Sequence, residues 1–450
     1  MISNIPQVKG LPILGSTLAA NKDQLGFLKR VVRECGDIGL FQLGRKNFVL
    51  INSPELVQSF LLENAQDYDK GEVQHTTFRM ILGNSLSLSE GEAHRVQRML
   101  LAPIFYNRNM EKYAKRIVNC ANCIIEKWKE NTEFDFFEEM MRLTLNTFCN
   151  VLMDIELLTE TEFDSARQTV WNWINYVAIH PIRFPLSIPT SRNQRFKSAL
   201  NVLNQRVRAI ITERRSKEED RGDILSKLVL ARYEDGRGMS DAQIYDETIA
   251  FLFAAHETGA SAITWSFYLL NNYPEIYSKV RYEIDTVLDE RLPTYADLRN
   301  LPYTLQVLKE AMRLYPPAAR QFRVALKDTE LGGYTIPKGT TVQISQYLLH
   351  RRSDCFPNPE NFNPDRFTEQ NEKNLPRFAY LPFGGGNRNC LGKHYAMIEG
   401  HLLLATLLQR VNFVLLPKQQ NVMPELAVTL RPERPIKAIV KRRTHTIQQR

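Results

Sequence analysis

The segment that most constrains the fold of this chain is a glycine-rich loop that ends in a cysteine, Phe383-Gly-Gly-Gly-Asn-Arg-Asn-Cys390-Leu-Gly392. Consecutive glycines let the backbone take positive φ angles and press close to a flat ligand, which a side chain would prevent. The next residues, 391–409, form an apolar run typical of a long helix, so Cys390 is expected at its amino-terminal end. The helix dipole and unpaired N–H groups there favour a thiolate. Such a thiolate is suited to ligate iron.

Composition indicates an ordinary globular protein, with 43% hydrophobic and 24% charged residues. The net charge of +8 favours acidic partners but is mild for a nucleic-acid binder, so no nucleic-acid partner is expected. Six scattered cysteines do not suggest a disulfide framework and fit a reducing compartment. The first residues show neither a membrane span nor a secretory signal, so we expect a cytoplasmic protein without a membrane anchor. Residues 6–15, spaced by Pro and Gly, should form an extended strap.

Most of the chain up to about residue 315 has helical periodicity, whereas strands are few. Residues 38–51 predict a hairpin with its turn at 44–47, and 322–344 predict short strands. The clearest helix runs from 240 to about 271, opened by a capping box of Ser240 and Gln243 and ended by Pro274. Its residues at three- and four-residue steps share one face. These are Ile244, Thr248, Phe251, Ala255, Thr258 and Ala262.

The loop resembles the haem-binding signature of the cytochromes P450, F-x-x-G-x-R-x-C-x-G. All five fixed positions match, at Phe383, Gly386, Arg388, Cys390 and Gly392. The resemblance implies a single, mainly helical domain over 1–450 with a small β-rich part, and haem b between the long helix and the cysteine helix. Cys390 would be the axial iron ligand, and Arg388 would meet a carboxylate of the cofactor. The alternative is a glycine-rich turn that carries a buried, inert cysteine.

Two further motifs strengthen the resemblance. The family's E-x-x-R matches Glu310 and Arg313 on a predicted helix over 301–314, with Arg366 as the expected third member of a charge triad. Residues 254–258 (AAHET) resemble the oxygen-binding A-G-x-[DE]-T of the family. By that resemblance Glu257 and Thr258 guide water and protons to bound oxygen. The usual glycine is Ala255 here, which narrows the groove over the haem by a methyl group.

Three basic side chains are candidates for contacts to the haem propionates. His94 and Arg98 resemble the family's W-x-x-x-R, with His94 in place of Trp. Arg323, ten residues after Arg313, lies where many members place another such arginine. Each could instead be a solvated surface charge.

The resemblance implies insertion of one oxygen atom from O₂ into a C–H or C=C bond of an apolar, lipid-like substrate such as a fatty acid or terpene. No region for a flavin or nicotinamide follows the cysteine helix, so a ferredoxin or flavin reductase must supply electrons and could dock near Lys393 and His394. Rival functions are a peroxide-driven or isomerising enzyme, a haem sensor or carrier, and a helical scaffold without cofactor. The candidate substrate residues are Arg45, Phe78, Phe251, Ala254 and Ala318. Aromatic residues that could line an apolar cavity are Trp171, Trp173, Tyr176 and Phe184.

Overall fold

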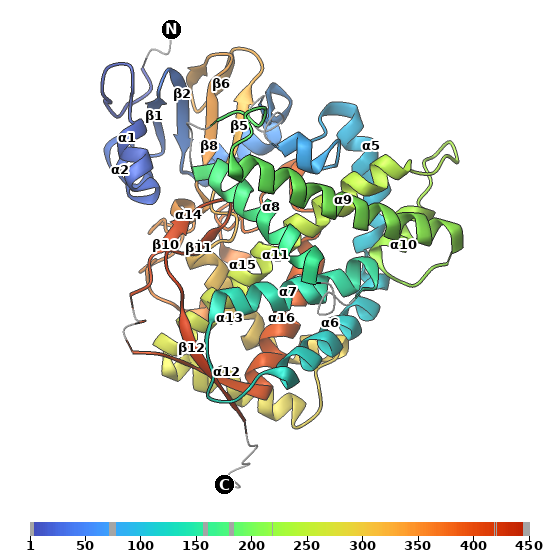
Figure 1. The fold of residues 1–450 in the computed structure, drawn as a ribbon. Helices are drawn as coiled ribbons and strands as arrows, with labels where there is room; N and C mark the ends of the chain where they lie inside the picture. Colours follow the sequence, from blue (N-terminus) through green and yellow to red (C-terminus); the bar gives the residue numbers. More distant parts are fainter. Residues whose placement is uncertain are drawn as a thin grey trace. The chain divides into compact units, whose positions relative to one another are not determined.

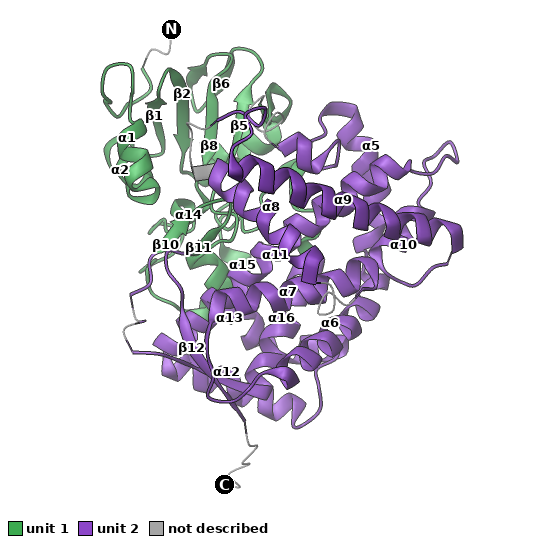
Figure 2. Ribbon diagram, in the orientation of Figure 1, with its two compact units in different colours: residues 1–77, 309–393, 424–431 green, residues 78–308, 394–423, 432–450 purple. Residues whose placement is uncertain are grey.

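The structure is a computed structural model that describes residues 4–71, 78–155, 161–179, 184–217, 219–417, 419 and 421–443. The chain divides into two compact units, coloured separately in Figure 2. The first unit comprises 1–77, 309–393 and 424–431, and the second comprises 78–308, 394–423 and 432–450. The chain passes from one unit to the other five times, after residues 77, 308, 393, 423 and 431. That 1–450 forms a single domain therefore stays a prediction.

A five-stranded sheet in strand order β1-β2-β8-β5-β3 frames the first unit (Figure 1). The hairpin predicted over 38–51 is confirmed as β1 and β2, with Leu43 opposite Lys46 and Gly44 at a φ of +58° in the turn. Strand β2 pairs with β8 in parallel, and the other neighbours are antiparallel. The strands are β1 (Ile38–Leu43), β2 (Lys46–Ile51), β3 (Tyr68–Asp69), β5 (Gln321–Ala325) and β8 (Thr341–Ile344).

Apolar side chains cover both faces of this sheet, because alternate residues of a strand point to opposite sides. Leu40 and Val49 belong to a buried cluster that includes Phe60, whereas Phe41 packs in a second cluster that includes Phe27 of helix α2 (Gln24–Cys35). The rings of Phe27 and Phe41 meet edge to face, with centroids 5.2 Å apart. Helix α2 is therefore fixed to the sheet by its apolar stripe.

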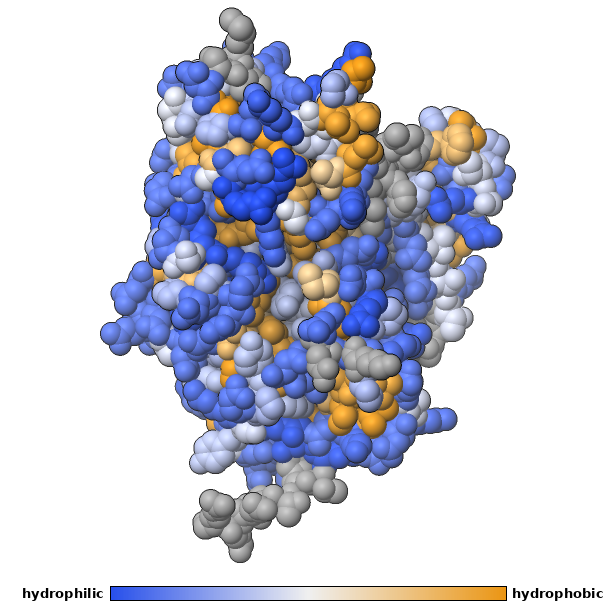
Figure 3. Space-filling model, turned by 90° about the vertical axis from the view of Figure 1, so that its left-hand side faces the viewer, coloured by the Kyte–Doolittle hydropathy of each residue, from blue (hydrophilic) through white to orange (hydrophobic). Residues whose placement is uncertain are grey.

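The amino-terminal strap expected over 6–15 is confirmed along β1 for residues 6–8, whereas residues 11–15 form a turn that is closed by backbone bonds between Leu11 and Gly15. The carbonyl of Pro6 accepts from the Leu40 N–H at 2.8 Å, and the Val8 N–H donates to the Leu40 carbonyl at 3.0 Å. Beyond it, exposed apolar side chains such as Ile13, 77% exposed, reach the surface. Figure 3, which views the side that carries α1 and α2, shows such residues as separate patches among hydrophilic ones.

The other elements of the first unit are short. Helical segments are α1 (Thr17–Lys22), α3 (Pro54–Gln58), η1 (Ser59–Glu63), η2 (Ala65–Asp67), α14 (Gln346–Leu349), η6 (Pro364–Phe367), α15 (Glu369–Asn374) and η7 (Gly386–Arg388). Two small antiparallel sheets pair β6 (Thr329–Leu331) with β7 (Tyr334–Ile336) and β10 (Pro424–Leu426) with β11 (Leu430–Pro432), whose last residue belongs to the second unit.

Helix α11 (Asp241–Asn272) is the main element of the second unit, and its bounds match the predicted helix within a residue. The Ser240 hydroxyl caps it by accepting from the Gln243 N–H at 3.2 Å. The predicted return bond of the capping box is replaced, because the Gln243 side-chain oxygen accepts from the Tyr233 hydroxyl at 2.7 Å. Pro274 begins the next helix, as expected from a residue that cannot continue the last one.

The remaining elements make the chain mainly helical with a small β part, as predicted. The helical elements are α5 (Gly91–Leu101), η3 (Ala102–Phe105), α6 (Asn107–Lys127), α7 (Phe136–Met153), α8 (Thr161–Ile179), α9 (Ser191–Lys217), α10 (Ile224–Leu230), α12 (Pro274–Leu288), η5 (Tyr295–Asn300), α13 (Pro302–Leu314) and α16 (Lys393–Arg410). A three-stranded sheet has the order β4 (Glu133–Asp135), β12 (Lys437–Arg442), β9 (Val411–Leu415). No helix of the described residues is long and apolar enough to cross a membrane.

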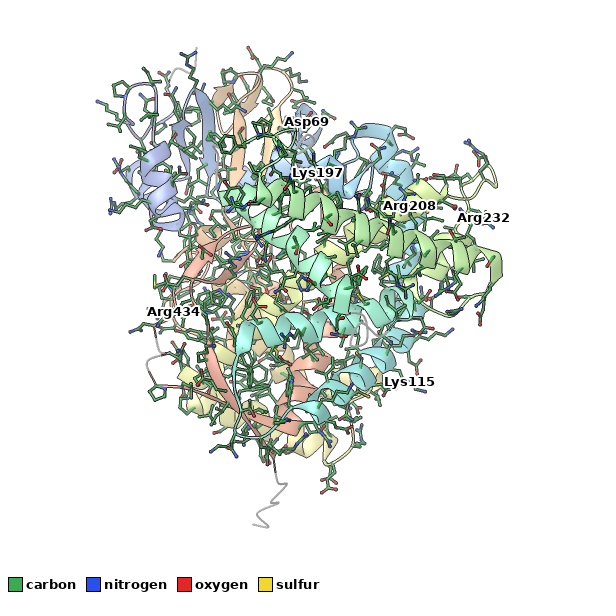
Figure 4. The ribbon with its side chains drawn as sticks, viewed as in Figure 1. Asp69, Lys115, Lys197, Arg208, Arg232 and Arg434 are labelled. Atoms are coloured by element: carbon green, nitrogen blue, oxygen red, sulfur yellow. The ribbon has the colours of Figure 1, made fainter. Side chains whose placement is uncertain are left out.

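Aromatic packing joins α7, α11 and β9 in the second unit. Phe413 lies 4.7 Å from Phe136 and 5.0 Å from Phe267, centroid to centroid, and meets both rings edge to face. At its middle, α9 is joined to α11 where the guanidinium of Arg208 lies over the ring of Tyr245 at 4.5 Å (Figure 4). Helix α11 is therefore held firmly along its length.

Two acids in the first half of α11 hold the loop before α5. Both carboxylate oxygens of the buried Glu247 accept from the Leu86 N–H, at 2.9 and 3.1 Å, and Asp246 accepts from the Asn84 N–H. Gly83 has a φ of +54°, and a Cβ there would lie 2.0 Å from an Asp246 oxygen. Burial, with a smaller effect of Asp246, raises the pKa of Glu247 to about 8.

The raised pKa of Glu247 predicts a pH-dependent stability. Between the ordinary value of 4.5 and about 8 the folded protein keeps a proton that the unfolded chain releases, so the free energy of unfolding falls as pH rises through this window. Glu247→Gln removes this dependence. Chemical denaturation should therefore give similar stabilities for the wild type and the variant near pH 5. Near pH 8 the variant should be more stable by on the order of 2 kcal/mol. A parallel fall in both proteins would contradict the expectation.

Candidate functional site

The cysteine loop lies in the first unit and closes on itself. The Cys390 N–H donates to the Phe383 carbonyl at 2.9 Å, and between them η7 makes one short helical turn that ends at Arg388. Cys390 is exposed, and α16 begins three residues later at Lys393. Phe383, Arg388 and Gly392 are half-buried. The cysteine therefore stands at the end of a tight loop, before the first turn of a long helix.

The glycines of this loop have a packing role that sequence reasoning missed. Gly384 and Gly386 have φ angles of +68° and +69°. A Cβ on Gly386 would lie 2.3 Å from the carbonyl oxygen of Leu61, and one on Gly385 would lie 2.8 Å from the ring of Phe378. The loop thus needs glycine to pack against η1, in addition to any approach to a ligand. No local sequence signal points to Leu61.

The structure brings the three predicted triad residues together. Arg313 binds Glu310 through two bonds, Nε to Oε2 at 2.6 Å and a terminal nitrogen to Oε1 at 2.8 Å. Arg366 lies 3.3 Å from Glu310 Oε1, and the Asn363 N–H donates to the same oxygen at 2.9 Å. The side chains of Glu310 and Arg313 are both 0% exposed. A buried pair of this kind is tolerated only when its remaining donors and acceptors are also bonded.

The remaining donors of Arg313 hold the segment that leads to the cysteine loop. They reach the carbonyls of His350, Pro359 and Asn361 at 2.9, 2.7 and 3.1 Å. Nε2 of His350 accepts from the Leu381 N–H at 2.8 Å, two residues before Phe383. The chain of contacts therefore runs from the buried pair to the start of the loop.

His350 is a positioning residue that sequence reasoning missed. Burial, with a smaller contribution from Arg313, lowers the pKa of His350 to about 3, so its ring is neutral and its Nε2 can accept. Its neighbours in sequence, Leu349 and Arg351, carry no motif that would have singled it out.

Other candidates in the first unit lie at the surface or at its edge. Arg323 in β5 is half-buried and donates to the Phe322 carbonyl at 2.8 Å. Arg45 is exposed in the hairpin turn, and Ala318 is exposed after α13. The expected docking residues are exposed at the start of α16, where Lys393 ends this segment of the first unit and His394 begins the next segment of the second.

In the second unit, the middle of α11 has one incompletely covered side. Phe251, Ala255 and Thr258 are half-buried and Ala254 is exposed, although most of the helix around them is buried. The Thr258 hydroxyl donates to the Ala254 carbonyl at 2.8 Å, and Glu257 is 1% exposed. Small residues on a partly open side leave room for a flat ligand.

The opposite side of the same segment is held by α7 and α8. The carbonyl of His256 accepts from the Thr144 hydroxyl at 3.0 Å. Arg167 reaches Nε2 of the His256 ring at 3.1 Å, and the edge of Trp171 meets that ring. Burial and, to a smaller extent, Arg167 lower the pKa of His256, so the ring is neutral. Contacts from α7 and α8 thus fix residues 254–258 on the side opposite to the partly open one.

The other candidates of the second unit lie on separate elements. His94 is buried and Arg98 half-buried, four residues apart on one face of α5, and Phe78 is half-buried. The aromatic residues expected to line one cavity lie in two different places. Trp171 stacks on Phe253 of α11, whereas Trp173 and Tyr176 line a pocket with Phe184 away from α11. Trp171 therefore does not share the pocket of the other three, because it lies on a different face of α8 from Trp173 and Tyr176.

The residues present fit a haem with a thiolate ligand. The first unit supplies an exposed cysteine on a rigid glycine loop, with the guanidinium of Arg388 two residues away for a propionate. The second supplies small side chains beside an acid and a hydroxyl on α11. The groups of the first unit can bind a flat iron macrocycle, and an acid beside a hydroxyl, as in the second, can deliver protons.

Comparisons with known proteins agree with this chemistry. The family model described as Cytochrome P450 matches residues 5–440. The cyclooctat-9-en-7-ol 5-monooxygenase of Streptomyces melanosporofaciens is 36% identical over 89% of this chain and 87% of its own length. The pentalenene oxygenase of Streptomyces avermitilis is 31% identical over 94% of both chains. The solved structure of retinoic acid-bound cyanobacterial CYP120A1 superposes with a TM-score of 0.88 at 28% identity, covering 98% of this chain and 100% of that one.

Removing the carboxylate of the triad should destabilise the protein strongly. Glu310→Ala leaves the guanidinium of Arg313 buried without a counter-charge, which costs about 3–5 kcal/mol. Denaturant unfolding of the purified protein measures this loss. Glu369→Ala breaks an exposed pair with Lys373 and serves as the control, with no measurable change expected. Equal stabilities of the two variants would show that the triad is not a structural centre.

Proposed function

The chain belongs to the cytochrome P450 family and is a monooxygenase. We propose that Cys390 would hold the iron of a haem b through its thiolate. The observation that carries the proposal is the exposed cysteine at the end of a glycine loop that is held by its own backbone bond and by His350. The haem, when bound, activates O₂ so that one oxygen atom enters a C–H or C=C bond of an apolar substrate.

The protein's own groups hold and orient this cofactor. The N–H groups at the start of α16 and the closed loop stabilise the Cys390 thiolate. Arg388 and Arg323 pair with propionate groups, and by the resemblance His94 and Arg98 do the same. Residues that shape the loop around the ring edge are Phe383, Gly386 and Gly392.

Proton delivery is assigned to Glu257 and Thr258. An acid and a hydroxyl side by side on an apolar helix can pass a proton to a reacting oxygen. The Thr258 hydroxyl donates to the Ala254 carbonyl, so it must turn away from that carbonyl to donate elsewhere. The methyl group of Ala255 lies on the same open side and limits the space for water.

Electrons come from a separate redox partner, which we propose to be a ferredoxin or a flavin reductase. The exposed Lys393 and His394 lie three and four residues after Cys390, and the net charge of +8 favours an acidic partner. A cytoplasmic location stays a prediction of the sequence.

The substrate class supported best is a terpene-like alkene or alcohol. Relatives named for cyclooctat-9-en-7-ol and pentalenene share about a third of this sequence. Phe251 and Ala254 offer an apolar surface on α11, and Phe78 and Ala318 remain candidates for the same role. A second class, apolar carboxylic acids, is favoured by the retinoic acid bound to CYP120A1 and by the exposed Arg45.

Thiolate ligation is tested by replacing Cys390. Cys390→Ser and Cys390→His should lose the red-shifted Soret band of the reduced carbon monoxide adduct, because that band depends on a thiolate ligand. Cys355→Ser, which changes a half-buried cysteine of the same unit, should keep it. If both Cys390 variants keep the band, the assignment is refuted. Binding of haem by the His variant without this band would be consistent with it.

The two substrate classes are separated by titrations that follow the haem spectrum. If Arg45 anchors a carboxylate at a partly exposed position, the contact contributes about 1 kcal/mol, or several-fold in affinity. Arg45→Ala should then weaken a long-chain fatty acid several-fold and leave the matching alkane and a cyclic terpene alcohol unchanged. Lys46→Ala, the adjacent exposed residue, is the control. If Arg45→Ala weakens the binding of none of these ligands, or weakens the acid and the alkane equally, only the neutral substrate class remains supported.

A further inference from the structure

Helix α8 has two different sides in the second unit. Arg167 and Trp171, four residues apart, contact His256 and Phe253 of α11. At about 100° per residue, Asn172, Trp173 and Tyr176 point to the other side of the helix. Whatever binds there is separated from α11 by the thickness of α8.

This second side forms a pocket of about 590 Å³ together with the first turn of α9 and the residues before it. Its volume lies in the range of small-molecule sites. The residues that the argument uses are Asn172, Trp173, Tyr176, Phe184, Arg192 and Arg195. All belong to the second unit, so the described lining of the pocket lies within that unit.

The apolar wall of the pocket is aromatic and is fixed by packing. Trp173 is 7% exposed and stacks on Phe196 of α9, with centroids 4.1 Å apart. Phe184, 69% exposed, adds a ring that no other part of the described chain buries. The buried Asn193 donates to two carbonyls of residues 184–190, which holds this connection against α9. The wall therefore does not need a ligand to form.

The polar wall is cationic. The guanidinium of Arg192 lies over the ring of Tyr176 at 3.6 Å, and Arg195 is exposed one turn along α9. None of the described residues that line the pocket is acidic, and the first turn of α9 contains no acidic residue. Two arginines beside a helix amino terminus repel each other unless an anion is present.

From these contacts we propose that the pocket between α8 and α9 binds an organic carboxylate with a flat apolar body, at a site separate from that of Cys390. The body lies on Trp173 and Phe184, and the carboxylate pairs with Arg192, whose stacking on Tyr176 already fixes its planar group for a two-bonded contact. The hydroxyl and amide groups of the rim, such as Asn172, add neutral hydrogen bonds.

The test uses the haem-loaded protein and 2-naphthoate as the probe. A bulky N-substituted imidazole, which binds the haem iron, is first added to saturation, as judged from the haem spectrum. Equilibrium dialysis then measures naphthoate binding. We expect binding to persist with the imidazole present, and the neutral analogue 2-naphthylmethanol to bind several-fold more weakly.

Variants then locate the site. Arg192→Ala should weaken naphthoate about tenfold, and Arg192→Lys should restore only part of the affinity, because an ammonium group cannot form the planar paired contact. Lys197→Ala is the matched control: it removes one positive charge from the same helix, at an exposed residue that does not line the pocket (Figure 4), and should leave binding unchanged. An unaltered carbon monoxide band in each variant shows that the fold is intact.

Three results would overturn the proposal. Loss of naphthoate binding when the imidazole is added would place the probe at the iron. Equal affinity of wild type and Arg192→Ala would show that this pocket is not used. Tight binding of 2-naphthyl phosphate in the absence of naphthoate binding would assign the pocket to phosphate esters instead.

Discussion

The cysteine loop depends on a pair of opposite charges that are both sealed from solvent, Glu310 and Arg313. Removing water from these groups is costly, so every donor of the guanidinium must find an acceptor. The acceptors are backbone carbonyls of the segment from His350 to Asn361, which the guanidinium thereby fixes. The neutral ring of His350 accepts a hydrogen bond from the Leu381 N–H, so the fixed segment extends to just before the loop. The segment that leads to Cys390 is thus fixed by a buried ion pair on another element, α13.

The middle of α11 is also fixed by contacts to neighbouring elements. One side of residues 254–258 presents small side chains and the Thr258 hydroxyl, and the other side is bonded to Thr144 and Arg167. Because a helix is stiff, contacts that fix one side of it also fix the groups on the opposite side. By the resemblance to the family motif, Ala255 stands where a glycine is usual, which adds one methyl group to the partly open side of this helix.

Helix α8 connects two distinct environments. Toward α11 it contributes a buried arginine and a tryptophan that contact the segment of Glu257 and Thr258. Away from α11 it contributes the aromatic floor of a cationic pocket. A ligand in that pocket would bind to the helix whose opposite side contacts His256 and Phe253 of α11.

By itself, the sequence determined what is local. The glycine spacing predicted the loop of Cys390, the capping serine and Pro274 set the bounds of α11, and the three-residue spacing on one helix paired Glu310 with Arg313. Such features depend on backbone angles and on helical period, which neighbouring residues specify.

Only the tertiary structure decided which distant groups meet. Arg366 reaches Glu310 across more than fifty residues, Leu61 packs under Gly386 from the other end of the chain, and His350 became a positioning residue only through its partners. Periodicity showed that Trp171 and Trp173 are aromatic residues on one helix, but not which neighbour covers each face. That choice is made by packing between elements, because a sequence pattern specifies the apolar side of a helix and not the surface against which that side is buried.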